Sequence, residues 1–174
     1  KDIHEFWDNL RFAKDCISEI PASRWSWQEL EARGVTSMKW GGFIEGVESF
    51  DAEFFGISPL EVRLMDPQHR LLLTHVWKAI EDAGYAPNAL AGTDTAIFVG
   101  TANTGYSELL TSNGLSSTSM VPSMGPARVS YLLNIHGPSE PIETACSSAL
   151  VAIHRAAGLL GSGKSQMAIA GGIN

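Results

Sequence analysis

The clearest hydrophobic pattern in the chain predicts a helix over Pro67–Ala83. Asp66 is a suitable N-cap, Pro67 fits the first helical position and Gly84 fits the stop after the last turn. The apolar residues recur at helical spacing and are expected to form the buried face: Leu72, Leu73, Val76, Trp77, Ile80 and Ala83. This segment therefore predicts a helix that packs along one face onto a core.

Further helices are predicted along the chain from similar periodicity. Ile3–Asp15 has a helical period with Ile3, Phe6, Trp7 and Leu10 on its apolar side. Pro126–Asn134 and Ser147–Leu160 are predicted as helices, the first ending near Gly137-Pro138. The polar residues 101–122 predict a loop with a short helix at Tyr106–Leu110.

Three short apolar runs alternate with these helices. Thr95–Gly100 predicts a buried strand, and Pro141–Ala145 and Gln166–Ala170 predict two more. Trp25 and Trp27 are expected on a loop after Pro21. Residues 36–60 look irregular, with strand-like pieces around Gly42-Phe43-Ile44. The alternation of strand and helix predicts an α/β layered fold.

Composition restricts the classes of partner and compartment. The 174 residues suggest one domain or part of one, with 44% hydrophobic and 18% charged residues, as in ordinary globular proteins. A net charge of −7 argues against binding nucleic acid or an anionic membrane surface. The apolar runs are too short to span a bilayer. Cys16 and Cys146 do not make a disulfide framework, so a reducing cytoplasm is expected.

Cys146 is the strongest candidate for chemistry. It lies between a predicted strand and a predicted helix, so we expect it on the first helical turn. The free N–H groups and positive dipole end at a helix N-terminus favour a thiolate and can hold an oxyanion. An acyl-accepting nucleophile needs both properties. Ser147 and Ser148 suit a structural role in the first turn, and Cys16, without such surroundings, is read as structural.

The segment Glu143-Thr144-Ala145-Cys146-Ser147-Ser148-Ala149-Leu150-Val151-Ala152 closely resembles the active-site segment of β-ketoacyl synthases, in particular the ketosynthase domains of modular polyketide synthases. Other stretches match in the same order, so the resemblance covers essentially the whole chain: Phe54–Pro59, Met65–Leu73, Trp77–Gly84 and Ala170–Asn174. The lead-in His136–Ile142 looks most like synthases served by a separate acyltransferase.

The resemblance implies a thiolase-like layered fold (αβαβα), with residues 1–174 as the amino-terminal part of a single ketosynthase domain. The first strand and the second half of the domain, which carries both catalytic histidines of the family, would be absent. By the same resemblance, Cys146 is the catalytic residue. It takes an acyl chain as a thioester, and a malonyl-type extender on a carrier protein then condenses with it by decarboxylation.

The resemblance also implies partners. Acyl chains arrive on the phosphopantetheine of an acyl carrier protein, so no cofactor or metal is expected to bind directly. Neighbouring synthase domains are expected, and such domains are usually homodimers with the strand Pro141–Ala145 near the twofold axis. Binding to nucleic acid or a membrane is not expected.

The histidines of the chain do not complete a site. His136 lies about 20 Å or more from Cys146 along an extended run at ~3.3 Å per residue. His154 lies roughly 12 Å away along the helix at ~1.5 Å per residue. His69 and His75 point to different faces of one helix, so they form no metal pair. All five histidines, His4 included, are read as surface or core residues, and the 174 residues alone are expected to be inactive.

Three alternatives remain open at this point. The chain could belong to a synthase that transfers acyl chains without extending them, or it could be a docking piece with an inert Cys146. It could also be a P-loop nucleotide-binding module, because Gly158–Ser165 satisfies G-x-x-x-x-G-K-[ST]. A P-loop needs a strand before it and a helix after it. The predicted order here is the reverse, which favours a glycine-rich turn after a helix.

Overall fold

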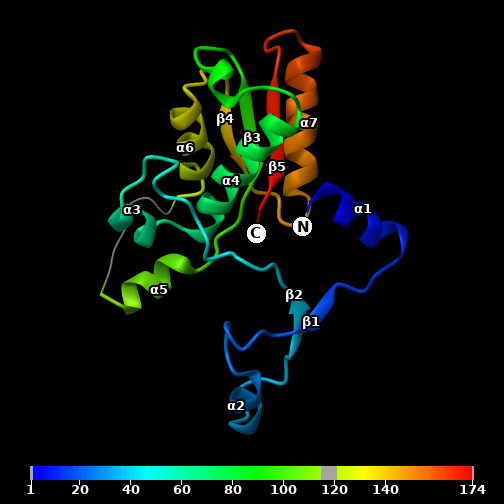
Figure 1. Ribbon diagram of the computed structural model, residues 1–174, viewed down its shortest axis with the longest axis vertical. Coiled ribbons are helices and arrows are strands. Elements are labelled where there is room, and N and C mark those ends of the chain that lie inside the picture. The colour runs from blue at the N-terminus through cyan, green and yellow to red at the C-terminus, as the bar shows by residue number, and fades with distance from the viewer. Residues whose placement is uncertain (1, 115–120, 174) are drawn as a thin grey trace. The chain divides into compact units, whose positions relative to one another are not determined.

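The computed structural model describes residues 2–114 and 121–173. The chain divides into two compact units, Lys1–Gly46 and Val47–Asn174 (Figure 1). The second unit contains Cys146 and the larger sheet, and each unit is described by itself below.

The first unit is built from α1 (Ile3–Arg11), α2 (Trp27–Ala32) and an antiparallel pair of strands, β1 (Ile17–Glu19) and β2 (Trp40–Gly42). The predicted helix to Asp15 is too long, because Phe12 caps α1 and the next residue turns into the left-handed region. The loop predicted at Trp27 is wrong. Ser26 Oγ accepts a hydrogen bond from the Glu29 N–H and starts α2 there.

The first unit buries little apolar surface of its own. The predicted apolar side of α1 is present as a stripe, but it is more than half exposed at each of Ile3, Phe6, Trp7 and Leu10. Ile20 is the one buried hydrophobic residue among the described residues of this unit. Periodicity predicted the presence and the apolar side of this helix, but it did not predict whether the apolar side would be covered.

A parallel three-stranded sheet forms the centre of the second unit. Its order is β4 (Ser139–Ile142), β3 (Ala96–Gly100) and β5 (Ala168–Gly172), so β3 lies between the other two. The strand predicted at Pro141–Ala145 begins earlier and ends at Ile142. The strand predicted at Gln166–Ala170 is shifted by two residues toward the C-terminus.

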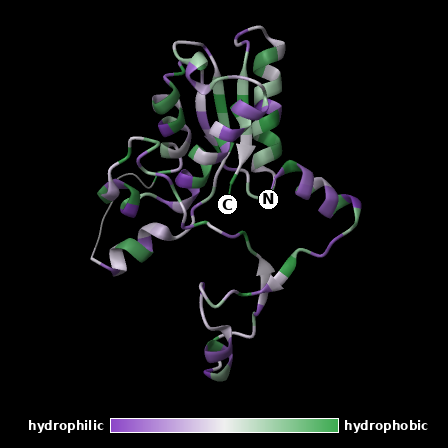
Figure 2. Cartoon of the chain, viewed as in Figure 1, coloured by the Kyte–Doolittle hydropathy of each residue, from purple (hydrophilic) through white to green (hydrophobic). Residues whose placement is uncertain are grey.

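Alternate residues of β3 face two different cores, as period-2 alternation requires. Ile97 and Val99 join the core formed with α4 (Pro67–Asp82) and α6 (Met124–Leu133). Ala96 and Phe98 face Ala152 and Ala156 of α7 (Ser148–Gly161). The result is a helix–sheet–helix arrangement, and Figure 2 shows that α7 is hydrophobic over much of its length. The predicted α/β layered fold is confirmed.

Helix α4 shows how closely the sequence signals match the structure. Asp66 is its N-cap and accepts a hydrogen bond from the Gln68 N–H at 2.8 Å. The predicted buried positions Leu72, Leu73, Val76 and Ile80 are buried, and Trp77 packs against the core from a half-buried position. Ala83 is exposed, contrary to prediction, because α4 ends at Asp82 and the chain turns away at Gly84.

The remaining elements surround this core: α3 (Pro59–Leu64), the 3₁₀ helix η1 (Pro87–Leu90) and α5 (Tyr106–Ser112). Of these, α5 confirms the short helix predicted at Tyr106–Leu110, whereas α3 was not predicted. Residues 115–120 of the predicted loop 101–122 lie outside the described residues. None of the helices in the described part of the chain has the length and hydropathy that a transmembrane span requires.

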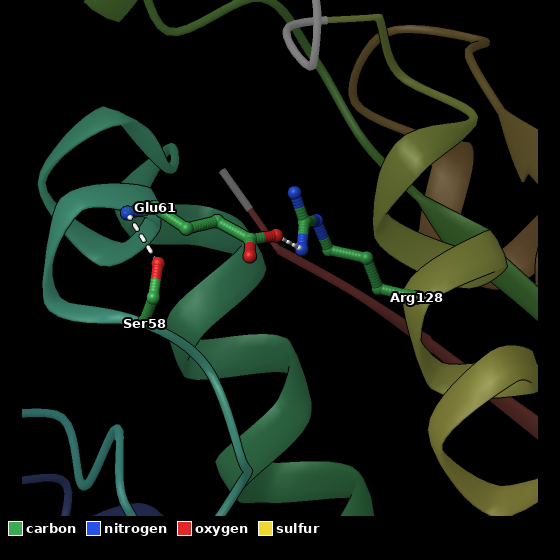
Figure 3. A network of polar contacts seen from close by, with 3 residues as sticks. All are labelled: Ser58, Glu61 and Arg128. Carbon is green, nitrogen blue, oxygen red and sulfur yellow. Dashed lines mark hydrogen bonds and ion pairs between the residues drawn. The ribbon is translucent and has the colours of Figure 1, made fainter.

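A polar network connects α3 to α6 (Figure 3). Ser58 Oγ accepts a hydrogen bond from the Glu61 N–H and caps α3. The Glu61 carboxylate pairs with the Arg128 guanidinium of α6. The side chain of Arg128 is only 15% exposed, so its charge depends on this partner more than a surface arginine would.

We predict that Glu61→Gln lowers the free energy of unfolding by about 1–2 kcal/mol, because it leaves a largely buried guanidinium without a counter-charge. Glu140→Gln is the matched control. It removes the Glu140–Arg155 pair, whose two side chains are 38% and 52% exposed, and is expected to cost less than about 1 kcal/mol. Urea unfolding monitored by circular dichroism measures both, and equal losses would contradict the prediction.

Candidate active site

Cys146 lies on the short connection between β4 and α7. The strand ends at Ile142 and α7 begins at Ser148, with Ser147 as its N-cap. The thiol is exposed. The prediction that Cys146 lies on the first helical turn is wrong by two residues. The chain first turns sharply at Ala145, which has a φ of +54°, and the helix starts only after that turn.

Hydrogen bonds from two serines hold this turn. Ser148 Oγ accepts from the Thr144 N–H at 2.9 Å and donates to the Ala145 carbonyl at 2.7 Å. Ser147 Oγ donates to the Thr144 carbonyl at 2.9 Å. The structural role expected for the two serines is confirmed by these contacts. They stabilise the left-handed conformation at Ala145, which an alanine adopts only at a cost in free energy.

A cavity of about 470 Å³ lies beside Cys146. Its lining includes Gly100 and Thr101 at the end of β3, Gly172 at the end of β5, and Glu143 and Cys146 on the connection. The carboxyl ends of neighbouring parallel strands open at the same edge of a sheet, which is where α/β proteins usually bind ligands. The thiol therefore faces a space that could receive a substrate.

Two glycines allow α7 to approach this edge of the sheet. A Cβ on Gly100 would lie 2.8 Å from the Ala149 nitrogen and from the Ser148 carbonyl carbon. A Cβ on Gly172 would lie 2.8 Å from the Ala149 Cβ. Both clashes involve backbone or a short side chain that cannot rotate away. The sequence signal for this contact was available, because a glycine that ends a buried strand often marks a close backbone approach.

Thr101 also lines this cavity, although the sequence predicted it only as part of a loop. Its N–H donates to the Ile142 carbonyl at 3.0 Å, which fixes its backbone between β3 and β4. The residue is only 4% exposed. Its Oγ1 is buried and has no hydrogen-bond partner in the described part of the chain. Periodicity could not identify this hydroxyl, because its lack of a partner is a property of the folded structure.

The histidines occupy the places expected for surface or core residues. His4, His75, His136 and His154 are exposed. His69 is buried in α4, and its Nδ1 has no partner among the described residues. Burial lowers the pKa of the His69 imidazole, with a further lowering by Arg128 and an opposing effect of Asp66. None of the five is among the residues that line the cavity beside Cys146.

A metal centre and a phosphate-binding loop are the alternatives to a site at Cys146. In residues 2–114 and 121–173 there is no group of three or more His, Cys, Asp or Glu that could hold a metal ion. The glycine-rich segment Gly158–Ser165 begins in the last turn of α7 and ends before β5, so the predicted order of helix and strand is confirmed. Ser165 Oγ donates to the Asp94 carbonyl at 2.7 Å, as a residue of a structural turn.

Comparison with known proteins decides the family. The sequence-family model of the β-ketoacyl synthase N-terminal domain matches residues 1–174. The chain belongs to the β-ketoacyl synthase family. Polyketide synthase PksN of Bacillus subtilis is 57% identical over 100% of the chain, and PksR of the same organism is 48% identical over 99%. The chain spans only 3% and 6% of these two relatives.

Solved ketosynthase structures agree with this assignment and with the predicted thiolase-like fold. The ketosynthase from module 6 of the bacillaene synthase of Bacillus subtilis 168 is similar with a TM-score of 0.89 and 36% identity. The match covers 100% of the chain and 30% of that structure. The oxazolomycin ketosynthase domain from Streptomyces albus JA3453 gives a TM-score of 0.88 at 37% identity, covering 100% and 32%.

We predict that Gly100→Ala destabilises the β-ketoacyl synthase fold by about 1–3 kcal/mol, because the added methyl group must displace the start of α7. Gly171→Ala is the matched control on neighbouring β5, where an added Cβ meets nothing within 4 Å. Thermal unfolding of both variants measures the difference. If Gly171→Ala costs as much as Gly100→Ala, the close approach is not the cause.

The lowered pKa of His69 predicts a pH dependence of stability. Below the ordinary histidine pKa of about 6.5, the unfolded chain binds a proton that folded His69 does not bind. The free energy of unfolding should therefore fall as the pH decreases from 7 to 5. His69→Gln should reduce this slope, whereas His75→Gln, at an exposed position of the same helix, should keep it. Urea unfolding at several pH values measures how the free energy of unfolding depends on pH. Equal pH dependence in the wild type and both variants would refute the assignment of this effect to His69.

Proposed function

We propose that the chain is the cysteine-bearing part of a ketosynthase of polyketide biosynthesis, an acyltransferase with Cys146 as its nucleophile. The observation that carries the proposal is the exposed thiol of Cys146 beside a cavity at the carboxyl edge of the parallel sheet. The family model for the amino-terminal domain supports residues 1–174 as the amino-terminal part of a single ketosynthase domain.

In the first step, Cys146 exchanges thioesters with an acyl carrier protein. The Cys146 sulfur attacks the carbonyl carbon of the acyl chain, the bond between that carbon and the phosphopantetheine sulfur breaks, and the proton of Cys146 passes to the departing thiolate. The N–H of Cys146 is proposed to donate to the oxyanion that forms during the attack. The position of Cys146 just before α7 favours this role, since the positive end of the helix dipole stabilises negative charge that forms beside it.

In the second step, a malonyl-type extender on a carrier protein loses CO₂, and the resulting carbanion attacks the Cys146 thioester. A carbon–carbon bond forms, the bond to the Cys146 sulfur breaks, and the lengthened β-ketoacyl chain remains on the carrier. Two histidines beyond residue 174 are proposed to promote this step, as the family resemblance implies. The described histidines do not line the cavity, so the 174 residues alone are expected to perform no condensation.

The proposed partners are an acyl carrier protein, neighbouring synthase domains and a second copy of the ketosynthase. Strand β4 lies at one edge of the described sheet, so its free side can face a second copy across a twofold axis. The segment His136–Ile142 supports a synthase served by a separate acyltransferase. The net charge of −7 and the two unpaired cysteines support a cytoplasmic enzyme that binds neither nucleic acid nor membrane.

We predict that an acyl-pantetheine thioester acylates Cys146 in the intact synthase. Intact-protein mass spectrometry with peptide mapping should find the acyl group on Cys146 in the wild type. Cys146→Ala should abolish this modification. Cys16→Ala is the matched control, because it removes the other exposed thiol and should leave the modification unchanged. Acylation of the Cys146→Ala variant at the wild-type level would refute the proposed nucleophile.

A further inference from the structure

Four polar residues line the cavity beside Cys146, and their side chains differ in the hydrogen bonds that they can still form. They are Thr101, Glu143, Cys146 and Ser148. The Ser148 hydroxyl already donates to the Ala145 carbonyl and accepts from the Thr144 N–H, and Glu143 is exposed to solvent. Cys146 is the nucleophile of the proposed function. Among the described residues of the lining, Thr101 is therefore the buried one whose side chain has unused hydrogen-bonding capacity.

The unused capacity of Thr101 has a cost in stability. A buried hydroxyl without a partner gives up its hydrogen bonds to water and gains none in the folded protein. Its backbone is held by the bond from its N–H to the Ile142 carbonyl, so the residue cannot move out to solvent without disturbing the sheet. A rotation about χ1 would break no hydrogen bond of the hydroxyl, because Oγ1 makes none among the described residues.

We propose that the Thr101 hydroxyl binds an oxygen of the acyl chain carried on Cys146 and so selects chains with a hydroxyl or keto group close to the thioester. This inference rests on the proposed function. A threonine hydroxyl both donates and accepts, so it can pair with either type of oxygen. An isosteric chain that lacks the oxygen leaves the hydroxyl unpaired in the occupied cavity, and such sites discriminate against that chain.

Burial favours the acyl chain over the carrier arm as the ligand of Thr101. The phosphopantetheine arm enters from solvent and can meet exposed groups such as Glu143 and Cys146 first. Thr101 lines the same cavity but is only 4% exposed, so it is less open to an arm that arrives from solvent. After transfer to Cys146, the acyl chain is the ligand that stays beside this lining.

The test measures acylation of Cys146 in the intact synthase by two small thioesters, 3-hydroxybutanoyl- and butanoyl-N-acetylcysteamine. Thr101→Val removes the hydroxyl at nearly constant shape, and Thr101→Ser keeps it. We expect Thr101→Val to lower the rate ratio of hydroxybutanoyl to butanoyl transfer about fivefold, the effect of one net hydrogen bond. Thr101→Ser should retain the wild-type ratio. The melting temperature of Thr101→Val should be unchanged or higher, because an unpaired buried hydroxyl is removed.

The outcomes separate the two proposals. An unchanged rate ratio in Thr101→Val, with Cys146 still acylated, overturns the role of Thr101 and leaves the proposed function standing. Equal slowing with both thioesters together with a lower melting temperature shows a packing role and also overturns it. If neither thioester acylates Cys146 in the folded wild type, the proposed function fails, and the inference that rests on it fails too.

Discussion

The close approach of α7 to the sheet is the constraint on which the candidate site depends. Gly100 and Gly172 lie at the carboxyl ends of β3 and β5, and neither position has room for a Cβ beside Ser148 and Ala149. Because the helix start is held there, the connection from β4 has only five residues, 143–147, in which to reverse direction. The left-handed turn at Ala145 follows from this short connection, and the turn leaves the thiol of Cys146 exposed at the cavity.

Polar side chains near this turn differ in whether they form hydrogen bonds. Ser147 and Ser148 form hydrogen bonds with the backbone of residues 144 and 145, and these bonds stabilise the strained connection. Thr101 is anchored through its N–H to the end of β4, and its hydroxyl has no partner among the described residues. Hydrogen-bonded side chains favour a rigid turn, whereas a hydroxyl without a partner can still bind a ligand. The same few residues thus combine the proposed nucleophile with the proposed recognition residue.

The sequence predicted the parts of this arrangement that depend on local pattern. The cap at Asp66, the buried face of α4 through Leu72 and Ile80, and the buried strand at 96–100 follow from spacing and turn chemistry. The identity of Cys146 as a candidate came from its place between strand and helix. The end of β4 was misplaced, because the residues up to Ala145 have no strand-breaking signal and the turn is imposed by the packing of α7 on Gly100. The free hydroxyl of Thr101 could not be predicted, since it depends on which atoms the fold brings near it.

Apolar surface on the described elements agrees with the proposal that the chain is part of a larger domain. Leu150 and Ile153 of α7 are each more than half exposed, and so are the apolar residues of α1 in the first unit. Exposed apolar side chains clustered on one helix are typical of surfaces that another protein segment covers. The solved ketosynthases that the chain matches are about three times as long, which provides such segments. The core around β3 and α7 is complete enough to position Cys146, whereas the histidines proposed to act on the extender are not among the described residues.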